Sequence, residues 1–473
     1  VLDAKAGAYK EPITALDFAS LYPNIIIAHN LCYTTYISNL MWSYLKDKCT
    51  LIDNNVVIPG SDIVFNTYKL NDTDIIIKEF ILSGSVYRFV QAPKLGLLPQ
   101  ILKELLSARK IAKKEMYKTN DPFMKSIFNG KQLALKISCN SVYGFCGATT
   151  GMLPLVDIAS SVCAIGRSMI EKTKWFVENN YDAEVIYGDT DSNLIRFYPP
   201  DDFNGGDLNY AFTVGTKCAQ ECTYELDKDT YYKGSVDLEF EKVYWPYMLF
   251  SKKRYCGNMY EDLNKPPKVD IKGLQVVRRD NAPIVKDICN NIINRLMTED
   301  FNVEAAVNDT KKTINELISN KIDIDKLVVS KKVSNLSRCD FCSKNYAFTI
   351  SDSGMKACDI CNTGLITTDL HKLPHVEVTR KMISRPDAEN PSPGDRVPYV
   401  FTKITNTTKK TKILQYKLAE DPDYVKKHNI PLDYDYYLKH QIKNPVCDLL
   451  GLIRDPQQLI FNDVERVINN KNN

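Results

Sequence analysis

Tyr187-Gly188-Asp189-Thr190-Asp191-Ser192 is the stretch around which the rest of the chain is organised. Apolar and β-forming residues flank it on both sides, at 183–186 and 193–197. A strand, a tight polar turn and a second strand are typical of a β-hairpin. The turn would carry two carboxylates to the hairpin tip, where they repel each other unless a cation lies between them. Because Asp and Gly are ordinary turn residues, the hexapeptide alone leaves a purely structural interpretation open.

Length and composition narrow the class of protein. A chain of 473 residues predicts two to four domains, at roughly 100–200 residues per domain. The net charge of +3 does not exclude nucleic-acid binding, because a basic cleft can lie in a nearly neutral protein. Fourteen cysteines in a chain of this size favour a reducing, intracellular compartment over a secreted disulfide scaffold. No apolar run reaches the ~18 residues that span a membrane, so no membrane partner is expected.

A further acidic residue lies near the end of another predicted strand. Residues 13–18 form the expected strand, and Asp17 lies near its end, just before Phe18 and the segment Ala19-Ser20-Leu21-Tyr22-Pro23-Asn24. Sites in α/β proteins are placed where strands end and lead into turns. Asp17 could equally cap a helix or stabilise a turn.

Two successive segments predict an antiparallel pair of helices. Residues 97–119 and 123–146 both have apolar residues at helical spacing, and a short connection favours antiparallel packing. Each helix carries polar residues four positions apart, which therefore share a face. These residues are Arg109 with Lys113, and Lys136 with Asn140. The two faces could bind a polyphosphate, although a solvated charged face is the alternative.

The remaining segments show weaker or more ordinary patterns. Short strands are expected at 56–58 and 74–77, and a longer strand at 235–250. Helices are expected at 154–180, at 210–228, from 281 to about 330 and in the amphipathic segment 433–453. The run Lys252-Lys253-Arg254-Tyr255 follows the long strand, and it could be a solvated basic turn or a phosphate contact.

Four cysteines have the spacing of a metal site. Cys339 and Cys342, then Cys358 and Cys361, form two C-x2-C pairs separated by fifteen residues. Two such pairs can close a tetrahedral zinc site, which predicts one structural Zn²⁺ in a ribbon at about 336–365. Disulfides and free buried thiols are the alternatives. The other ten cysteines are expected to be small core residues.

Assembled in order, these segments resemble the family B DNA polymerases. Residues 17–24 resemble that family's first palm motif, D-x-x-S-L-Y-P-S, with Asn24 in place of the usual Ser. Residues 136–144 are similar to the fingers motif K-x3-N-S-x-Y-G, the hairpin to Y-G-D-T-D-S, and residues 252–255 to K-K-R-Y. Three further stretches, at 240–244, 273–280 and 394–400, resemble the delta branch in particular.

The resemblance implies an α+β fold with the right-hand arrangement of polymerases. It assigns an antiparallel-sheet palm to 1–96 and 148–273, helical fingers to 97–147, and a mostly helical thumb with the inserted zinc ribbon to 274–473. The family's exonuclease region is not seen upstream, so the chain is expected to be the C-terminal polymerase part of a longer protein. The position of the ribbon favours a large, nucleocytoplasmic-type DNA virus as its source, with activity in the nucleus or at a cytoplasmic viral replication site.

By the same resemblance, the expected activity is template-directed DNA synthesis with two Mg²⁺ ions. The principal metal ligands would be Asp17, Asp191 and the backbone carbonyl of Phe18, with Asp189 as a secondary catalytic acid. Lys136 would also protonate the leaving group. Nucleotide contacts are implied for Ser20, Leu21, Tyr22, Arg109, Lys113, Lys136 and Asn140. DNA contacts are implied for Tyr143, Gly144, Lys252, Lys253, Arg254 and Tyr255.

The implied partners are primer–template DNA, deoxynucleoside triphosphates and a sliding clamp or other processivity factor. Tyr22 would lie beneath the sugar, where a 2′-hydroxyl would clash. Two alternatives stay open: a polymerase that makes or copies RNA, and a catalytically weak or inactive polymerase-like scaffold that lacks its N-terminal half. The Tyr22 motif argues against the first, and the intact acidic residues argue against the second.

Overall fold

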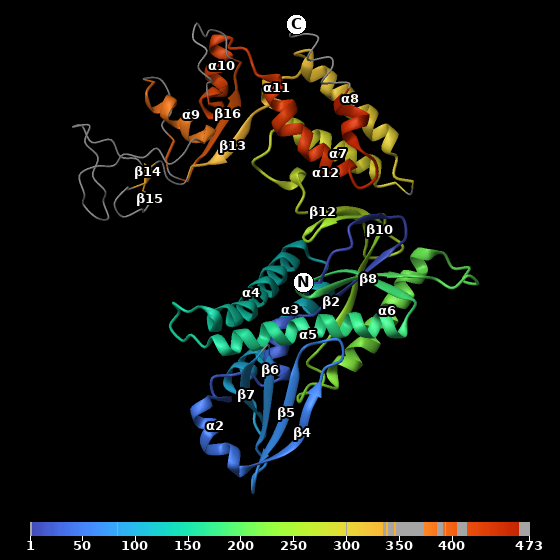
Figure 1. Cartoon of the computed structure of the whole chain (residues 1–473), viewed down its shortest axis with the longest axis vertical. Coiled ribbons are helices and arrows are strands. Elements are labelled where there is room, and N and C mark those ends of the chain that lie inside the picture. Colours follow the sequence, from blue (N-terminus) through green and yellow to red (C-terminus); the bar gives the residue numbers. More distant parts are fainter. Residues whose placement is uncertain are drawn as a thin grey trace, which may run out of the picture. The chain divides into compact units, whose positions relative to one another are not determined.

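The computed structural model describes residues 2–82, 84–298, 300–333, 337–338, 345–346, 373–385, 391–392, 394–403 and 414–462. The chain divides into two compact units (Figure 1). The first unit comprises Val1–Lys5, Tyr9–Lys252 and Gly257–Val269, and the second comprises Ala6–Ala8, Lys253–Cys256 and Asp270–Asn473. None of the described helices is long and apolar enough to cross a membrane. The four cysteines of the predicted zinc ribbon lie outside the described residues.

An antiparallel sheet forms the centre of the first unit. Four strands lie wholly within it, in the order β10-β2-β9-β8. They are β2 (Ile13–Phe18), β8 (Ala183–Asp189), β9 (Ser192–Phe197) and β10 (Leu238–Ser251). The predicted hairpin and the strands predicted at 13–18 and 235–250 are therefore confirmed. Apolar residues of β2 are buried, including Ile13, Leu16 and Phe18, so the strand is held in the core while its polar end reaches the edge of the sheet.

Two long helices pack against this sheet, α5 (Val156–Asn180) and α6 (Asp207–Asp227). The apolar residues Ile158, Val162, Ile165 and Met169 of α5 follow helical spacing, and all four are buried. A short helix, α1 (Leu21–Ala28), follows β2 directly and packs against α5. Ser20 precedes α1 with a left-handed backbone, at φ 49°. This turn places the residues after Asp17 beside the end of the central sheet.

The predicted helix pair is confirmed as α3 (Leu97–Lys118) and α4 (Pro122–Gly147), which pack along each other (Figure 1). Asp121 caps α4 by accepting a hydrogen bond from the backbone N–H of Phe123. Most of the pair is solvent-exposed: the buried residues are Pro99, Leu102 and Ala112 of α3 and Gln132, Cys139 and Cys146 of α4. The pair therefore exposes both charged residues, such as Lys113 and Lys136, and large apolar residues, such as Ile111 and Ile137.

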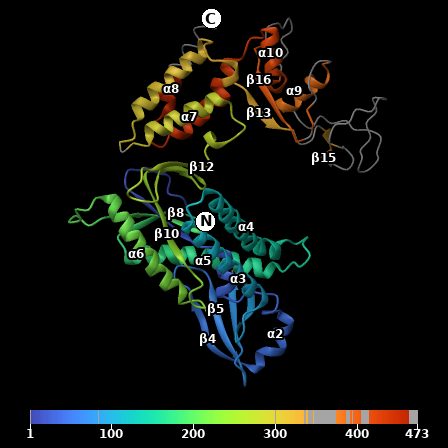
Figure 2. The same cartoon turned by 180° about the vertical axis from the view of Figure 1, so that it is seen from behind.

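A second sheet in the first unit was largely missed by the sequence analysis. Its order is β3-β7-β6-β5-β4, and Figure 2 labels β4 and β5 of this sheet, drawn in blue. The strands are β3 (Tyr36–Ile37), β4 (Cys49–Val57), β5 (Val64–Leu70), β6 (Ile76–Leu82) and β7 (Ser85–Ala92), with α2 (Asn39–Leu45) beside them in sequence. Lys78, Glu79 and Arg88 are buried within this sheet, and Arg88 Nε lies 2.5 Å from Glu79 Oε2. Buried charges interrupt the apolar alternation by which strands are recognised.

The second unit combines helices with a small sheet. Its helices are α7 (Pro283–Leu296), α8 (Val303–Ile318), α9 (Pro374–Ile383), α10 (Pro422–His428), α11 (Tyr434–Tyr436), the π-helical η5 (Tyr437–Ile442) and α12 (Lys443–Leu450). Its three-stranded sheet has the order β13-β16-β17, formed by β13 (Val329–Lys332), β16 (Arg396–Phe401) and β17 (Ala419–Glu420). The expectation of a mostly helical C-terminal part overlooked this sheet, whose strands are short and far apart in sequence.

The remaining elements are short or divided. Strands β1 (Gly7–Tyr9), β11 (Arg254–Tyr260) and β12 (Lys268–Lys272) contain residues of both units. A two-stranded ladder pairs β14 (Ser337–Arg338) with β15 (Asn345–Tyr346). Single turns are η1 (Lys46–Lys48), η2 (Gln275–Val277), η3 (Ile324–Lys326), η4 (Gln415–Leu418) and η6 (Gln457–Phe461).

Candidate active site

The central sheet brings Asp17 and Asp191 together from distant parts of the sequence. Strands β2 and β9 pair so that Asp17 lies opposite Ser192. The backbone N–H of Phe18 donates a hydrogen bond of 2.7 Å to the carbonyl oxygen of Asp191. Thr190, at the hairpin tip, has a left-handed backbone with φ 56°, which allows the tight turn. The two carboxylates are therefore positioned by backbone pairing rather than by flexible loops.

Both carboxylates are partly buried, and the surroundings favour their protonated forms. Burial, followed by the negative charge of Asp191, raises the pKa of Asp17 from 3.8 to about 7. Burial also raises the pKa of Asp191, and the charge of Asp189 adds to the effect while Lys136 opposes it. The site therefore gathers more negative charge than its own cations neutralise, which is the electrostatic condition for binding a cation.

Two glutamates of β10 belong to the same acidic group, and the sequence analysis assigned them no role. Glu239 lies opposite Asp17 in the sheet register, and a bulge follows between Phe240 and Lys242. The charge of Glu241 raises the pKa of both Asp17 and Asp191. Glu239 is paired opposite Asp17, whereas Glu241 lies in the bulge, where the alternation of side chains is interrupted. The sequence reveals neither position, because both depend on the pairing of β10 with β2.

The donor set fits a divalent cation of the magnesium type. Carboxylate and carbonyl oxygens are the ligands that Mg²⁺ prefers, and it retains several water ligands. Asp17, Asp191 and the carbonyl of Phe18 supply such oxygens at the end of β2. Within the described residues, no group of three or more His, Cys, Asp or Glu side chains is arranged to hold a metal ion by itself. The protein's main ligands for such a cation would thus be the two carboxylates of Asp17 and Asp191.

The helix pair brings part of its predicted nucleotide-binding group to this site. Arg109 of α3 donates a hydrogen bond from Nη1 to Ser20 Oγ, at 2.8 Å, and its buried Nε has no partner among the described residues. Lys136 of α4 is exposed, and its charge acts on Asp191. Lys113 and Asn140 are exposed on the same helices. Arg109 thus contacts the turn after Asp17, and Lys136 acts on Asp191.

Two tyrosines form the apolar side of the site. The rings of Tyr22, in α1, and Tyr143, in α4, lie with centroids 4.5 Å apart at an interplanar angle of 39°. Burial is the main cause that raises the pKa of Tyr22. Leu21 is buried in the core, at 5% exposure, so only its backbone is available to a ligand. A Cβ added to Gly144 would meet no atom within 4 Å, so open space adjoins this turn of α4.

Comparison with known proteins identifies the family of the chain. A family described as "DNA polymerase family B" matches residues 1–349 and 366–453. The chain belongs to this family. The DNA polymerase delta catalytic subunit of Arabidopsis thaliana is 38% identical over 455 residues, which cover 94% of this chain and 35% of that protein. The subunit of the same name from Schizosaccharomyces pombe is 38% identical over 478 residues, covering 99% and 37%.

A solved structure agrees at the level of the fold. The family B DNA polymerase from the hyperthermophilic archaeon Pyrobaculum calidifontis matches 96% of this chain and 46% of its own, with a TM-score of 0.59 and 20% sequence identity. The family B polymerase fold with antiparallel sheets, expected from the sequence, is thereby confirmed. The chain spans about a third of the length of the curated relatives it matches.

The basic run of this family B chain is engaged in ion pairs within the molecule. Lys252 Nζ lies 2.8 Å from Asp3 Oδ1 in the first unit. Arg254 Nη2 lies 2.8 Å from Asp448 Oδ2 in the second unit. Lys253 has a left-handed backbone, at φ 65°, and Tyr255 is half-buried. A phosphate contact by Lys252 or Arg254 would therefore replace an existing ion pair.

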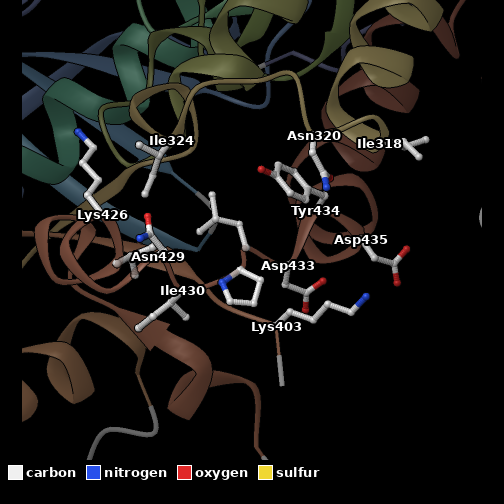
Figure 3. A pocket seen from close by; sticks show the side chains of 13 residues that line it. Ile318, Asn320, Ile324, Lys403, Lys426, Asn429, Ile430, Asp433, Tyr434 and Asp435 are labelled. Carbon is white, nitrogen blue, oxygen red and sulfur yellow. The ribbon is translucent and has the colours of Figure 1, made fainter. Parts of the chain in front are cut away.

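A cavity of about 770 Å³ lies elsewhere, within the second unit (Figure 3). Apolar side chains such as Ile318 and Ile430 line it together with Lys403, Lys426 and Asp435. None of the predicted catalytic residues lines this cavity. This cavity therefore does not mark the position of the paired carboxylates Asp17 and Asp191.

The raised pKa of Asp17 predicts a measurable dependence of stability on pH. The folded chain holds this proton up to about pH 7, whereas the carboxyl in an unfolded chain ionises near 3.8. The folded state therefore binds more protons between these pH values, and its stability must fall as the pH rises through them.

In EDTA, the free energy of unfolding of the wild type relative to Asp17→Asn should fall by about 1–2 kcal/mol between pH 5 and pH 8. Without solvent screening, the pKa shift of Asp17 would change the free energy of unfolding by roughly twice that amount or more, but the carboxyl group is partly exposed and water screens the effect. Urea denaturation of both proteins at each pH measures the difference. Saturating Mg²⁺ should abolish it, and a difference that rises with pH would contradict the assignment.

Proposed function

We propose that this family B chain catalyses template-directed DNA synthesis, adding deoxynucleotides to a primer 3′-hydroxyl with release of pyrophosphate. The observation that carries the proposal is the pairing of β2 with β9, which joins the partly buried Asp17 to Asp191. The match to DNA polymerase family B and the names of the delta catalytic subunits support it.

Asp17, Asp191 and the Phe18 carbonyl would hold two Mg²⁺ ions, with Asp189 as a secondary acid. When bound, such a pair of ions activates the attacking hydroxyl and stabilises the leaving oxygen of an in-line phosphoryl transfer. Family B polymerases generally use divalent metal ions. The raised pKa values of Asp17 and Asp191 support this role, because burial first and then neighbouring negative charges disfavour the ionised carboxylates, and a bound cation would stabilise them.

The residues of the helix pair would bind the triphosphate of the incoming nucleotide. Arg109, Lys113 and Lys136 supply positive charge, and Asn140 supports them with an amide. Lys136 would also donate a proton to the leaving pyrophosphate oxygen, since its charge already acts at Asp191. The backbone N–H groups of the turn at 20–22 would hold phosphate oxygens. Tyr22 would face the sugar.

The DNA contacts would come from Tyr143 and Gly144 in α4 and from residues 252–255. Contacts from lysine and arginine to phosphates position a strand without reading its sequence. Lys252 and Arg254 would exchange Asp3 and Asp448 for phosphate oxygens, so part of their contribution is offset by the ion pairs they lose.

The expected domains follow the same proposal: palm at 1–96 and 148–273, fingers at 97–147 and thumb at 274–473. The partners would be primer–template DNA, deoxynucleoside triphosphates and a sliding clamp or other processivity factor. The expected source in a large DNA virus stays a prediction, drawn from the family resemblance and the position of the cysteine pairs. The relatives named above are eukaryotic, and they leave that prediction and the predicted intracellular location untested.

The proposal includes one structural Zn²⁺ bound by Cys339, Cys342, Cys358 and Cys361. Its support is the sequence spacing. Elemental analysis of freshly purified, reduced protein should give about one zinc per chain, since four thiolates fill a tetrahedral site. Cys358→Ser should reduce the zinc content severalfold, whereas Cys49→Ser should leave it unchanged. A zinc content near zero in the wild type would reject the ribbon.

The experiment that tests the proposed function is extension of a labelled primer on a DNA template with Mg²⁺ and each deoxynucleotide in turn. Extension only by the nucleotide complementary to the template base supports template-directed DNA synthesis. Equal use of an RNA template or of ribonucleotides would favour the RNA-polymerase alternative. Tight binding of primer–template without any incorporation would favour a polymerase-like scaffold.

A further inference from the structure

Cys163 of α5 differs in its surroundings from most cysteines of the chain. Of the ten cysteines that the structure describes, seven are buried, as expected for small core residues, whereas Cys163 is half-buried. Its neighbours Val162 and Ala164 are buried, which fixes this part of α5 in the core of the first unit. The thiol Sγ lies 2.8 Å from the hydroxyl oxygen of Tyr143, across the boundary between α5 and α4.

This hydrogen bond continues into the tyrosine pair of the candidate active site. The Tyr143 ring lies 4.5 Å from the Tyr22 ring. Both pKa values reflect the thiol: the hydrogen bond to Cys163 is the main cause that raises the pKa of Tyr143, and after burial Cys163 is the next cause that raises the pKa of Tyr22. The Cys163 thiol, the Tyr143 side chain and the Tyr22 ring thus form one connected group.

A second residue of α5, Gly166, lies close to the Tyr22 ring. Gly166 lies one helical turn beyond Cys163, and a Cβ added there would lie 3.9 Å from Tyr22 Cε1 and 3.4 Å from Ile25 Cδ1. The absence of a side chain at Gly166 lets α1 approach α5 closely. Tyr22 is therefore held from one side by α5 and from another by Tyr143, and Tyr143 is itself held by the thiol.

We propose that Cys163 is a positioning residue that fixes the Tyr143–Tyr22 pair, and that it thereby sharpens discrimination between deoxyribonucleotides and ribonucleotides. This inference rests on the proposed function, in which Tyr22 faces the sugar. A ring excludes a 2′-hydroxyl only when it cannot move aside. Packing limits how far the Tyr143 ring can shift. The hydrogen bond between its hydroxyl group and Cys163 Sγ also limits how far the ring can rotate.

The test measures kcat and KM for single-nucleotide incorporation of matched deoxy- and ribonucleotides by the full chain. Cys163→Ala removes the hydrogen-bond partner, Cys163→Ser keeps one, and Tyr143→Phe removes the phenol from the other side. Cys49→Ala replaces another half-buried thiol, on β4, and serves as the control. Thermal denaturation of each variant confirms that it is folded.

Cys163→Ala should lower the ratio of kcat/KM values, deoxy over ribo, by roughly three- to tenfold, the size expected for one lost hydrogen bond. The change should come mainly from a lower KM for the ribonucleotide, because a ring that can move aside excludes the 2′-hydroxyl less, whereas the deoxynucleotide should bind nearly as before. Cys163→Ser should restore most of the ratio. Tyr143→Phe should match Cys163→Ala, and the double variant should be no worse than either, since both remove one interaction.

An active wild type whose ratio is unchanged in Cys163→Ala overturns this inference and leaves the proposed function standing. Additive losses in the double variant overturn it as well, because they would show that the two residues act separately. A wild type that binds primer–template but incorporates no nucleotide overturns both the inference and the proposed function. Should Cys163→Ala fail to fold, Tyr143→Phe and Cys163→Ser still provide the comparison.

Discussion

Replacing Asp17 or Asp191 by Asn should reduce nucleotide incorporation by about a thousandfold or more, while primer–template binding changes little. Asn has nearly the same shape as Asp but lacks the charge, so the pair would lose its affinity for divalent cations. Phosphoryl transfer depends on positioning and on neutralising charge, and an enzyme that loses a metal ligand loses both. Single-turnover incorporation at saturating Mg²⁺ measures the effect, and fluorescence anisotropy with labelled primer–template measures binding.

Stability provides an independent check on this result. The pKa of Asp17, raised to about 7, shows that the folded chain disfavours its ionised form. Asp17→Asn should therefore be at least as stable as the wild type above pH 7, and a loss of activity could not be attributed to unfolding. Asp74→Asn changes an exposed acid outside the site and should extend primers normally. Wild-type rates in Asp17→Asn or Asp191→Asn would remove both residues from the catalytic role.

The sequence predicted those parts of the fold whose signals are local. Helix α5 is recognisable because Ile158, Val162, Ile165 and Met169 repeat at helical spacing and all face the core. The hairpin β8–β9 is recognisable because its turn and both strands are contiguous. Only fragments of the sheet β3–β7 were predicted, as short strands at 56–58 and 74–77, because Lys78, Glu79 and Arg88 are buried in it, and their burial depends on partners that only the folded chain provides.

The candidate site shows the same limit. Asp17 and Asp191 could be paired from sequence only through the family resemblance, because the register of β2 with β9 joins residues that are far apart in the chain. Glu241 remained unassigned because its proximity to Asp17 depends on the pairing of β10 with β2 and on a bulge. Cys163 was expected to be a core residue, since nothing in its local pattern indicates that it meets Tyr143 from another helix.

Tyr22→Ala should lower discrimination against ribonucleotides by about two orders of magnitude, the largest change in substrate choice expected of any variant. Deoxyribose and ribose differ by one hydroxyl, and an open polar site would accept that hydroxyl by hydrogen bonding to it or to water. A rigid ring gives it no room, so selectivity comes from repulsion of the wrong substrate. Removing the ring removes that repulsion, while the phosphate contacts that bind both nucleotides remain.

The measurement is the ratio of kcat/KM values for matched deoxy- and ribonucleotides in single-nucleotide incorporation. Tyr22→Phe is the matched control, because it keeps the ring that lies 4.5 Å from Tyr143 and removes only the hydroxyl. It should retain nearly the full discrimination. If Tyr22→Ala shows the wild-type ratio, Tyr22 does not exclude ribose. Cys163→Ala should lower discrimination far less than Tyr22→Ala. The first variant only loosens the Tyr143–Tyr22 pair, whereas the second removes the ring that excludes the 2′-hydroxyl.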